Sequence, residues 1–457
     1  MEDEVVIASS SLEAGIGCWD LRSGAEHLRY RSCASPPHGL VSVAGRFLAS
    51  SQLRDSSSSS GSVLFWSWNK PQVEVKSFPA EAINPLACNT DGTYIVGGGV
   101  SGHIYLWEVA TGRLLKKWHG HYRPVTCLVF SNDQSLLISG SEDGTVRVWS
   151  LLMIFDEEGQ QRAGHLYEYS FTGHALPVTD IVTGYGGSNA IILSASLDRT
   201  CKVWSLARGT LLRNIVFPSI IDAVALDPGE HVFYAGGRDG KIYIAELNAQ
   251  TTSNNNNNNN NYGLHIIGTL SDQSKAICSL GFALDGFQLV VGSEDGMVRV
   301  WDTKTRNIIR VFKHAKGPVN NIVVMRQPAA LYPRTAGNNN NNNNQGPMAR
   351  RHVALPPPLE KYSSIDEHSE LNAFITPRSN SYDVTSYTTL QSMNNQINEL
   401  QQHGSSGASE MELERLKLDC KRSMQMVQQW KKMYQNLNQF CVGELLNGEA
   451  DETNLML

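Results

Sequence analysis

The chain has 457 residues, 41% of them hydrophobic, so it is long enough for one large domain with an appendage. Its formal net charge of -6 excludes an overall basic field that would attract nucleic acid, and contact with RNA is expected only indirectly. The acidic start Met1-Glu2-Asp3-Glu4 is unlike a signal peptide, and no run approaches the ~18 apolar residues of a membrane span. We therefore expect an intracellular protein without membrane contact.

One phrase recurs through the first 325 residues: a small or acidic residue, usually a glycine next, then alternating apolar residues and a tryptophan. In chain order, the tryptophan position holds Trp19, Trp66, Trp107, Trp149, Trp204, Ala245 and Trp301. Three intervals are 41 or 42 residues long, within the ~40–45 residues typical of a propeller repeat. The longer intervals contain insertions at 56–60, 153–164 and 254–261, which we expect in loops.

Each repeat predicts four short strands. In the repeat of Trp149, apolar runs at 125–130 and 135–139 come first, and Ser-Glu-Asp-Gly at 141–144 supplies a tight hairpin turn before the tryptophan strand. Such a sheet cannot bury both faces alone, but seven sheets arranged radially can. The expected fold class is all-β, a seven-bladed β-propeller over residues 1–326.

The two ends of the repeat region complement each other. The run at 318–325 has no strands after it, whereas the Trp19 repeat has strands at 5–9 and 26–31 but lacks a first strand. Together they supply four strands. We expect them to form one blade, which closes the ring and removes two open sheet edges.

The sequence resembles the WD-repeat family at Gly120-His121 and Gly173-His174, each of which precedes a tryptophan-bearing strand. In that family a His, a Ser or Thr, an Asp and a Trp form a hydrogen-bonded tetrad. The resemblance implies two complete structural tetrads, namely His121, Ser139, Asp143 and Trp149, and His174, Ser194, Asp198 and Trp204. Other repeats depart from the pattern, with Ser60 or Ser101 at the Asp position and Ala245 at the Trp position, and are expected to rely on packing.

The arrangement of the whole chain, with repeats followed by a linker and a helix, is similar to that of the WD-repeat subunit family of the rixosome, a complex that matures the large ribosomal subunit. The resemblance lies in the opening phrase 5–20, in Trp118-His119-Gly120-His121 and in a helix over 413–441. It implies a non-catalytic scaffold of a nuclear complex in the nucleolus and nucleoplasm. The implied partners are a helical-repeat scaffold of the rixosome, a midasin-type AAA ATPase and the pre-ribosome.

Beyond the repeats, proline and asparagine runs predict a disordered linker over 327–388. A helical coiled-coil tail is expected over 389–442, with a flexible C-terminus at 443–457. Its seam positions alternate three and four apart and are occupied, apart from the polar Ser423, by Leu413, Leu416, Cys420, Val427, Trp430, Tyr434, Leu437 and Cys441. This tail is expected to form a homodimer, while a partner subunit or the chain's own propeller remains an alternative surface for it.

Sequence motifs of catalysis and of cofactor binding are missing or have another explanation. The glycines at 97–102 match G-x-G-x-x-G, but a strand follows them where a dinucleotide site needs a helix. Eight cysteines are scattered without a Cys-x-x-Cys pair, which favours buried thiols over a metal site or disulfides. The prediction is a protein that is not an enzyme and has no catalytic residues, cofactor or metal.

A second function stays open. Trp19-Asp20-Leu21-Arg22 fits the Trp-Asp-x-Arg signature of substrate receptors for cullin–RING ubiquitin ligases. Trp-Asp is also an ordinary strand ending in WD repeats, and the arginine can simply solvate a turn.

Overall fold

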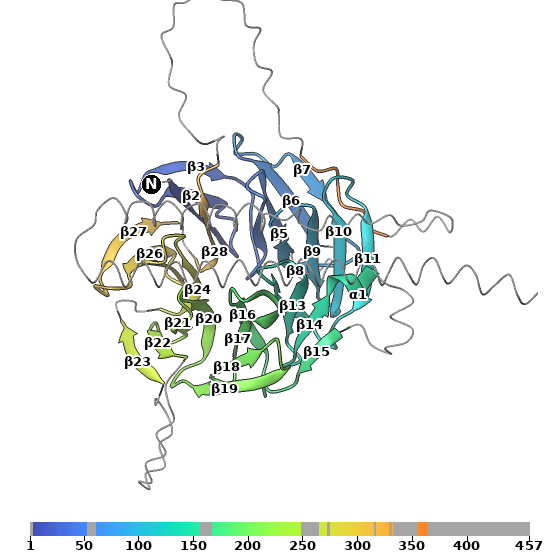
Figure 1. Cartoon of the computed structure of the whole chain (residues 1–457). Coiled ribbons are helices and arrows are strands. Elements are labelled where there is room, and N and C mark those ends of the chain that lie inside the picture. The colour runs from blue at the N-terminus through green and yellow to red at the C-terminus, as the bar shows by residue number, and fades with distance from the viewer. Residues whose placement is uncertain are drawn as a thin grey trace, which may run out of the picture. The chain divides into compact units, whose positions relative to one another are not determined.

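A computed structural model describes residues 3–52, 61–155, 167–247, 265–271, 275–314, 317–328, 331 and 355–362. These residues form seven four-stranded antiparallel sheets, or blades, arranged around a ring (Figure 1). The prediction of a seven-bladed β-propeller is confirmed. The predicted coiled-coil tail and C-terminus at 389–457, with all the seam residues, lie outside the described residues.

Each blade runs from an innermost strand at the centre of the ring to an outermost strand. Blade 1 contains β28 (Val319–Arg326), β1 (Glu4–Ser10), β2 (Ile16–Asp20) and β3 (Glu26–Tyr30). Blade 2 contains β4 (Leu40–Val43), β5 (Phe47–Gln52), β6 (Ser62–Ser67) and β7 (Val75–Ser77). Blade 3 contains β8 (Ile83–Cys88), β9 (Tyr94–Gly99), β10 (His103–Glu108) and β11 (Leu114–His119). Blade 4 contains β12 (Val125–Phe130), β13 (Leu136–Ser141), β14 (Val146–Ser150) and β15 (Tyr167–Phe171).

The remaining three blades follow the same order. Blade 5 contains β16 (Val178–Thr183), β17 (Ile191–Ser196), β18 (Thr200–Ser205) and β19 (Thr210–Val216). Blade 6 contains β20 (Ile221–Leu226), β21 (Val232–Gly237), β22 (Ile242–Glu246) and β23 (Ile266–Leu270). Blade 7 contains β24 (Ile277–Phe282), β25 (Gln288–Ser293), β26 (Met297–Asp302) and β27 (Ile308–Lys313). Two short helices, α1 (Leu151–Phe155) and the 3-10 helix η1 (Gly187–Asn189), lie in connections.

The ring closes within blade 1. Strand β28 pairs antiparallel with β1, so that Val5 lies opposite Met325 and Ile7 opposite Val323. The remaining strands of that blade come from the N-terminal side of the chain. This is the closure that the two sequence fragments predicted, and it gives the first and last strands of the ring a common sheet.

The hairpin turns follow the sequence signals. Gly144 and Gly296 have φ values of +77° and +80° in the turns before the tryptophan strands, a conformation that favours glycine. The glycine-rich run at 97–102 ends β9 and turns into strand β10, so no helix follows it. The dinucleotide motif is therefore a hairpin, as its context indicated.

Neighbouring blades pack through a recurring aromatic contact. The tryptophan of one blade meets the last aromatic residue of the preceding blade's outer strand, as in Trp204 stacked on Phe171 with 4.6 Å between ring centroids. Trp149 meets Trp118 at 5.8 Å, and Trp19 meets Phe312 at 5.6 Å. Because each contact joins two blades, the core of the protein lies between sheets rather than inside one of them.

The structure differs from the sequence prediction in part of the linker. Composition predicts disorder over 327–388, yet residues 355–362 lie against blades 2 and 3, with Leu359 only 4% exposed (the orange segment in Figure 1). Three consecutive prolines restrict the unfolded chain here, so ordering this segment costs less entropy than ordering the neighbouring polar sequence.

Candidate functional site

The four predicted tetrad residues of blade 4 lie in one hydrogen-bonded chain. Trp149 Nε1 donates to Ser139 Oγ at 2.8 Å, and Ser139 Oγ lies 2.7 Å from His121 Nε2. His121 Nδ1 lies 3.2 Å from Asp143 Oδ2. The chain of donors is satisfied when the imidazole is neutral and carries its proton on Nδ1.

Blade 5 repeats this arrangement. Trp204 Nε1 donates to Ser194 Oγ at 2.9 Å, His174 Nε2 lies 2.8 Å from Ser194 Oγ, and His174 Nδ1 lies 3.0 Å from Asp198 Oδ2. The Asp198 carboxylate also accepts from the backbone N–H groups of Ala175 and Thr200. Each tetrad thus ties a connecting loop to the central strands of its blade.

Protonation within the tetrads is shifted by their surroundings. Burial lowers the pKa of His121 more than the adjacent Asp143 raises it. Burial alone would raise the pKa of Asp143, but hydrogen bonds from His121 and Thr145 outweigh it and hold that pKa well below its usual range. The pKa of Asp198 is lowered in the same way, because hydrogen bonds from His174 and Thr200 outweigh the effect of burial. Both aspartates are therefore carboxylates at neutral pH.

The other repeat positions use different partners. Trp66 Nε1 donates to the carbonyl of Arg31 at 3.3 Å, and Trp107 Nε1 donates to the carbonyl of Glu360 at 2.9 Å. Trp19 packs between Phe312 and the edge of His314. These tryptophans have found acceptors or ring contacts outside a tetrad.

Blades 6 and 7 show two further departures. Ala245 is fully buried among aromatic side chains, since Phe217 approaches both Phe233 and Tyr243 beside it. In blade 7 an ion pair between Arg299 Nη2 and Asp295 Oδ2, 2.7 Å long, spans the turn of the Trp301 hairpin. Packing and a local ion pair hold these two hairpins.

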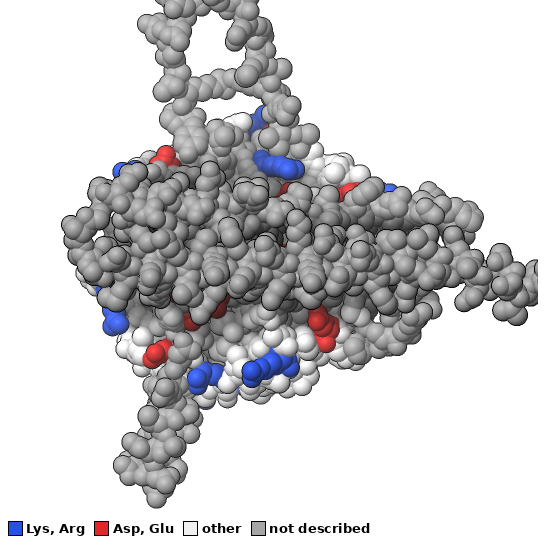
Figure 2. Space-filling view, viewed as in Figure 1, with Lys and Arg blue, Asp and Glu red and all other residues white. Residues whose placement is uncertain are grey.

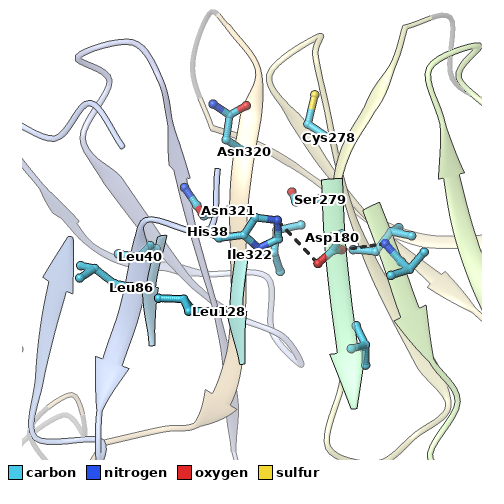
Figure 3. Close-up of a pocket in the computed structure, with 13 residues that line it drawn as sticks. His38, Leu40, Leu86, Leu128, Asp180, Cys278, Ser279, Asn320, Asn321 and Ile322 are labelled. Atoms are coloured by element: carbon cyan, nitrogen blue, oxygen red, sulfur yellow. Dashed lines mark hydrogen bonds and ion pairs between the residues drawn. The ribbon is translucent and has the colours of Figure 1, made fainter. Parts of the chain in front are cut away.

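A small cavity lies at the centre of the ring (Figure 3). Its volume is about 160 Å³, and residues of all seven innermost strands line it. This is smaller than the ~300–1,000 Å³ pockets that hold drug-sized ligands. The cavity can take a few water molecules, and its size argues against a metabolite or nucleotide site.

One polar contact crosses this cavity. His38, just before β4 in blade 2, places Nε2 3.6 Å from Asp180 Oδ1 on β16 of blade 5 (Figure 3). The same Nε2 donates to the carbonyl of Thr179 at 3.1 Å. Asp180 also accepts from the backbone N–H groups of Ile181 and Val224. Burial raises the pKa of Asp180, while His38 and the two N–H groups oppose that shift.

Sequence reasoning missed His38 and Asp180. The signal that could have found them was a carboxylate inside the apolar run Val-Thr-Asp-Ile-Val at 178–182. Because Asp180 sits on an inner strand, only ring closure shows what faces it.

In the described residues no cluster of three or more His, Cys, Asp or Glu side chains could hold a metal. Four of the described cysteines are buried, and burial raises the pKa of thiols such as Cys18 to about 12. Cys420 and Cys441 lie outside the described residues. Where the structure describes the chain, it contains no helix long and apolar enough to span a membrane.

The outer strands of the blades differ in whether they expose large apolar side chains. The outer strands of blades 1 to 4 expose charged side chains, which are Glu26, Lys76, Lys117 and Glu168. Those of blades 5 to 7 expose Lys313 and, in addition, apolar side chains between 44% and 53% accessible, which are Leu211, Leu212, Ile267, Ile309 and Val311. We call these five residues the apolar rim. Around the margin visible in Figure 2, basic and acidic groups are interspersed.

A surface groove of about 520 Å³ adjoins the apolar rim at blades 7 and 1. Arg22, the last residue of the Trp-Asp-x-Arg motif, lines it together with Arg310 and the exposed side chains of Leu284, Phe287 and Ile309. Asp20 of the same motif accepts a hydrogen bond from the backbone N–H of Ser23. The motif therefore makes a turn and also presents one arginine to this groove.

Seven blades and the two His-Ser-Asp-Trp tetrads define a WD-repeat β-propeller protein. Residues 112–150, 166–205 and 264–302 match the WD domain, G-beta repeat family. The chain is 52% identical over 447 residues to Protein ROOT INITIATION DEFECTIVE 3 of Arabidopsis thaliana, covering 96% of this chain and 98% of that protein.

Two further relatives narrow the family. Over 333 residues the chain is 32% identical to WD repeat-containing protein 18 of Homo sapiens, covering 72% of this chain and 74% of that protein. It is also 26% identical over 333 residues to Pre-rRNA-processing protein IPI3 of Yarrowia lipolytica, covering 71% of this chain and 76% of that protein. The chain belongs to the family of WD-repeat proteins that includes these relatives.

Proposed function

We propose that this chain is a non-catalytic scaffold subunit of a nuclear complex that matures the large ribosomal subunit and processes pre-rRNA. The observation that carries the proposal is its relationship to proteins named for pre-rRNA processing, one in Yarrowia lipolytica and one in Schizosaccharomyces pombe. The fold alone would not support it, because propellers host many unrelated functions.

The geometry of the histidines supports a role without chemistry of its own. A catalytic base needs a ring nitrogen within reach of substrate. In both tetrads the two ring nitrogens are already bonded to Ser and Asp, and His121 is completely buried. The central cavity is also too small for a nucleotide.

The apolar rim supports a role in binding protein. Exposed strand edges with apolar side chains are unfavourable in water and favour association. The apolar rim spans the outer strands of three consecutive blades, so it offers exposed apolar side chains on each of them to a partner. By resemblance, the partners would be the helical-repeat scaffold of the rixosome and, through it, the midasin-type AAA ATPase and the pre-ribosome.

Depletion of the protein tests this proposal. We expect precursors of large-subunit rRNA to accumulate while small-subunit precursors keep their normal level, as measured by blotting of pulse-labelled RNA. Re-expression of the wild-type chain should restore the profile. A normal large-subunit profile after complete depletion would contradict the proposal.

The exposed Arg22 beside a surface groove favours one alternative, a substrate receptor of a cullin–RING ubiquitin ligase. Affinity purification separates the two functions, because either ribosome-maturation factors or ligase subunits would co-purify. Arg22→Ala provides the matched variant. It should abolish ligase recovery under the alternative and leave ribosome-maturation factors bound under our proposal.

A further inference from the structure

An extended segment of the C-terminal region packs against blades 2 and 3, and we call the surface that it contacts the groove. We call residues 355–362, Leu-Pro-Pro-Pro-Leu-Glu-Lys-Tyr, the strap. The side chain of Leu359 is buried in the same core cluster as Trp107 and Leu114, and Leu355 packs against that cluster. The strap thus fills part of the boundary between two blades that are distant from it in sequence.

The strap supplies a hydrogen-bond acceptor that blade 3 lacks. In blades 4 and 5 the indole N–H donates to a serine, Ser139 or Ser194. The equivalent residue of blade 3 is Gly97, which has no side chain to accept. Trp107 donates instead to the carbonyl oxygen of Glu360 at 2.9 Å. A buried indole N–H without an acceptor is costly, so the strap stabilises this blade.

Three more hydrogen bonds define the groove. The Leu359 N–H donates to Ser77 Oγ at 2.8 Å, on the outer strand of blade 2. The Glu360 N–H donates to the carbonyl of Gly112 at 2.8 Å, in blade 3. The Leu114 N–H donates to Glu360 Oε2 at 3.3 Å. Donors and acceptors from two blades therefore converge on two adjacent residues of the strap.

The shape of the groove suits a proline-rich chain. A Cβ atom at Gly112 would come within 2.6 Å of the Pro358 carbonyl oxygen, so the glycine permits this close approach. The residues at 356–358 are prolines, which have no N–H to satisfy and need no donor site in the groove. Prolines also favour the extended conformation before binding, which lowers the entropy lost.

We propose that this groove is a binding site for an extended proline-rich segment ending in Leu-Glu, and that the strap occupies it in cis. Docking fixes the position of the strap beside blades 2 and 3. The groove recognises its ligand by one buried leucine, one backbone carbonyl facing Trp107 and two backbone N–H groups. This inference is independent of the proposed role in ribosome maturation.

The test uses full-length protein and hydrogen exchange. In the wild type the amides of Leu359 and Glu360 should exchange slowly, because both are hydrogen-bonded within the groove. Leu359→Asp places a charge in an apolar site and should speed exchange of the segment about tenfold or more. Lys361→Ala changes an exposed neighbour and should leave exchange at the wild-type rate.

A synthetic peptide of residues 355–362 then reports on the groove itself. It should bind the Leu359→Asp chain, whose groove is free, and not the wild type, whose groove is filled. A peptide carrying the same Leu359→Asp change should bind neither chain. A tethered segment acts at an effective concentration of the order of millimolar, so a strap that stays bound has a dissociation constant below about 1 mM. Binding of the free peptide should therefore be detectable by NMR at about 1 mM peptide.

Trp107→Phe keeps an aromatic ring and removes the indole N–H. In the full chain it should speed exchange at Glu360 about tenfold while the strands of the other blades keep their protection, and it serves as the second variant where Leu359→Asp fails to fold. Rapid exchange of the strap in the wild type would overturn the proposal. So would failure of the peptide to bind the freed groove at 1 mM.

Discussion

His38 and Asp180 face each other across the centre of the ring, with 3.6 Å between Nε2 and Oδ1, although they belong to blades 2 and 5. His38→Ala leaves the buried carboxylate without its imidazole neighbour and the Thr179 carbonyl without a donor. We expect a loss of about 1–3 kcal/mol in the free energy of unfolding, measured by urea denaturation at pH 7. The exposed His231→Ala is the control, and an equal effect of both changes would contradict a specific cross-ring contact.

Asp198 accepts hydrogen bonds from His174, Thr200 and Ala175. Asp198→Ala should lower the free energy of unfolding by about 1–3 kcal/mol, because His174 Nδ1 loses its acceptor in a buried site. The exposed Asp91→Ala should change it by less than about 0.5 kcal/mol. Unchanged stability of the Asp198 variant, together with loss of an enzymatic activity, would show that the tetrad is catalytic.

His314 gives a specific dependence on pH. Its ring is 2% exposed, and burial, with a smaller contribution from Arg29, lowers its pKa from 6.5 to about 4. The unfolded chain binds this proton first, so the stability is fully present above pH 6.5 and is lost as the pH falls toward 4. At about 1.4 kcal/mol per pH unit, the loss by pH 4 is roughly 3 kcal/mol.

His314→Phe removes the titrating group and keeps an aromatic ring beside Trp19. We expect its free energy of unfolding to fall less steeply between pH 6.5 and 4 than that of the wild type, in urea titrations at half-unit steps. Parallel pH profiles for the two proteins would mean that His314 is not the group responsible. Asp143 and Asp198 have pKa values below their usual range, so their contribution is lost only at more acidic pH.

Ala245 tests whether local packing or the usual tryptophan of the repeat decides the stability of blade 6. Its surroundings are filled by Phe217 and Phe233, so Ala245→Trp would introduce a second bulky ring into an occupied space. We expect destabilisation of about 1–3 kcal/mol by thermal melting, although the change restores the repeat's usual residue. Increased stability would show that blade 6 has room for the tryptophan.

The predicted tail lies outside the described residues and can be tested in solution. Val427→Asp with Leu437→Asp puts charges into the seam and should convert a dimer into a monomer, measured by light scattering at micromolar concentration. Gln428→Asp with Asn438→Asp, off the seam, is the control and should remain dimeric. A monomeric wild-type protein would contradict self-pairing and leave a partner helix as the seam's ligand.

Sequence by itself determined the number of blades, their order and the closure of the ring. Each of these depends on short-range signals: an alternating strand, a turn glycine such as Gly144 and a tryptophan at a fixed distance from it. The two tetrads could also be predicted from the sequence, because the four residues of each tetrad fall within one repeat. Where the pattern was incomplete, as at Ala245, the sequence indicated only that packing must compensate.

Tertiary structure alone decided the contacts between distant parts of the chain. His38 meets Asp180 because seven inner strands converge on one axis, and Trp107 meets Glu360, 253 residues away, because the strap returns to the ring. The apolar rim exists only because the ring places the outer strands of three consecutive blades at its margin. Such contacts join residues that no local period relates, and ring closure, not the pattern of any one repeat, brings them together.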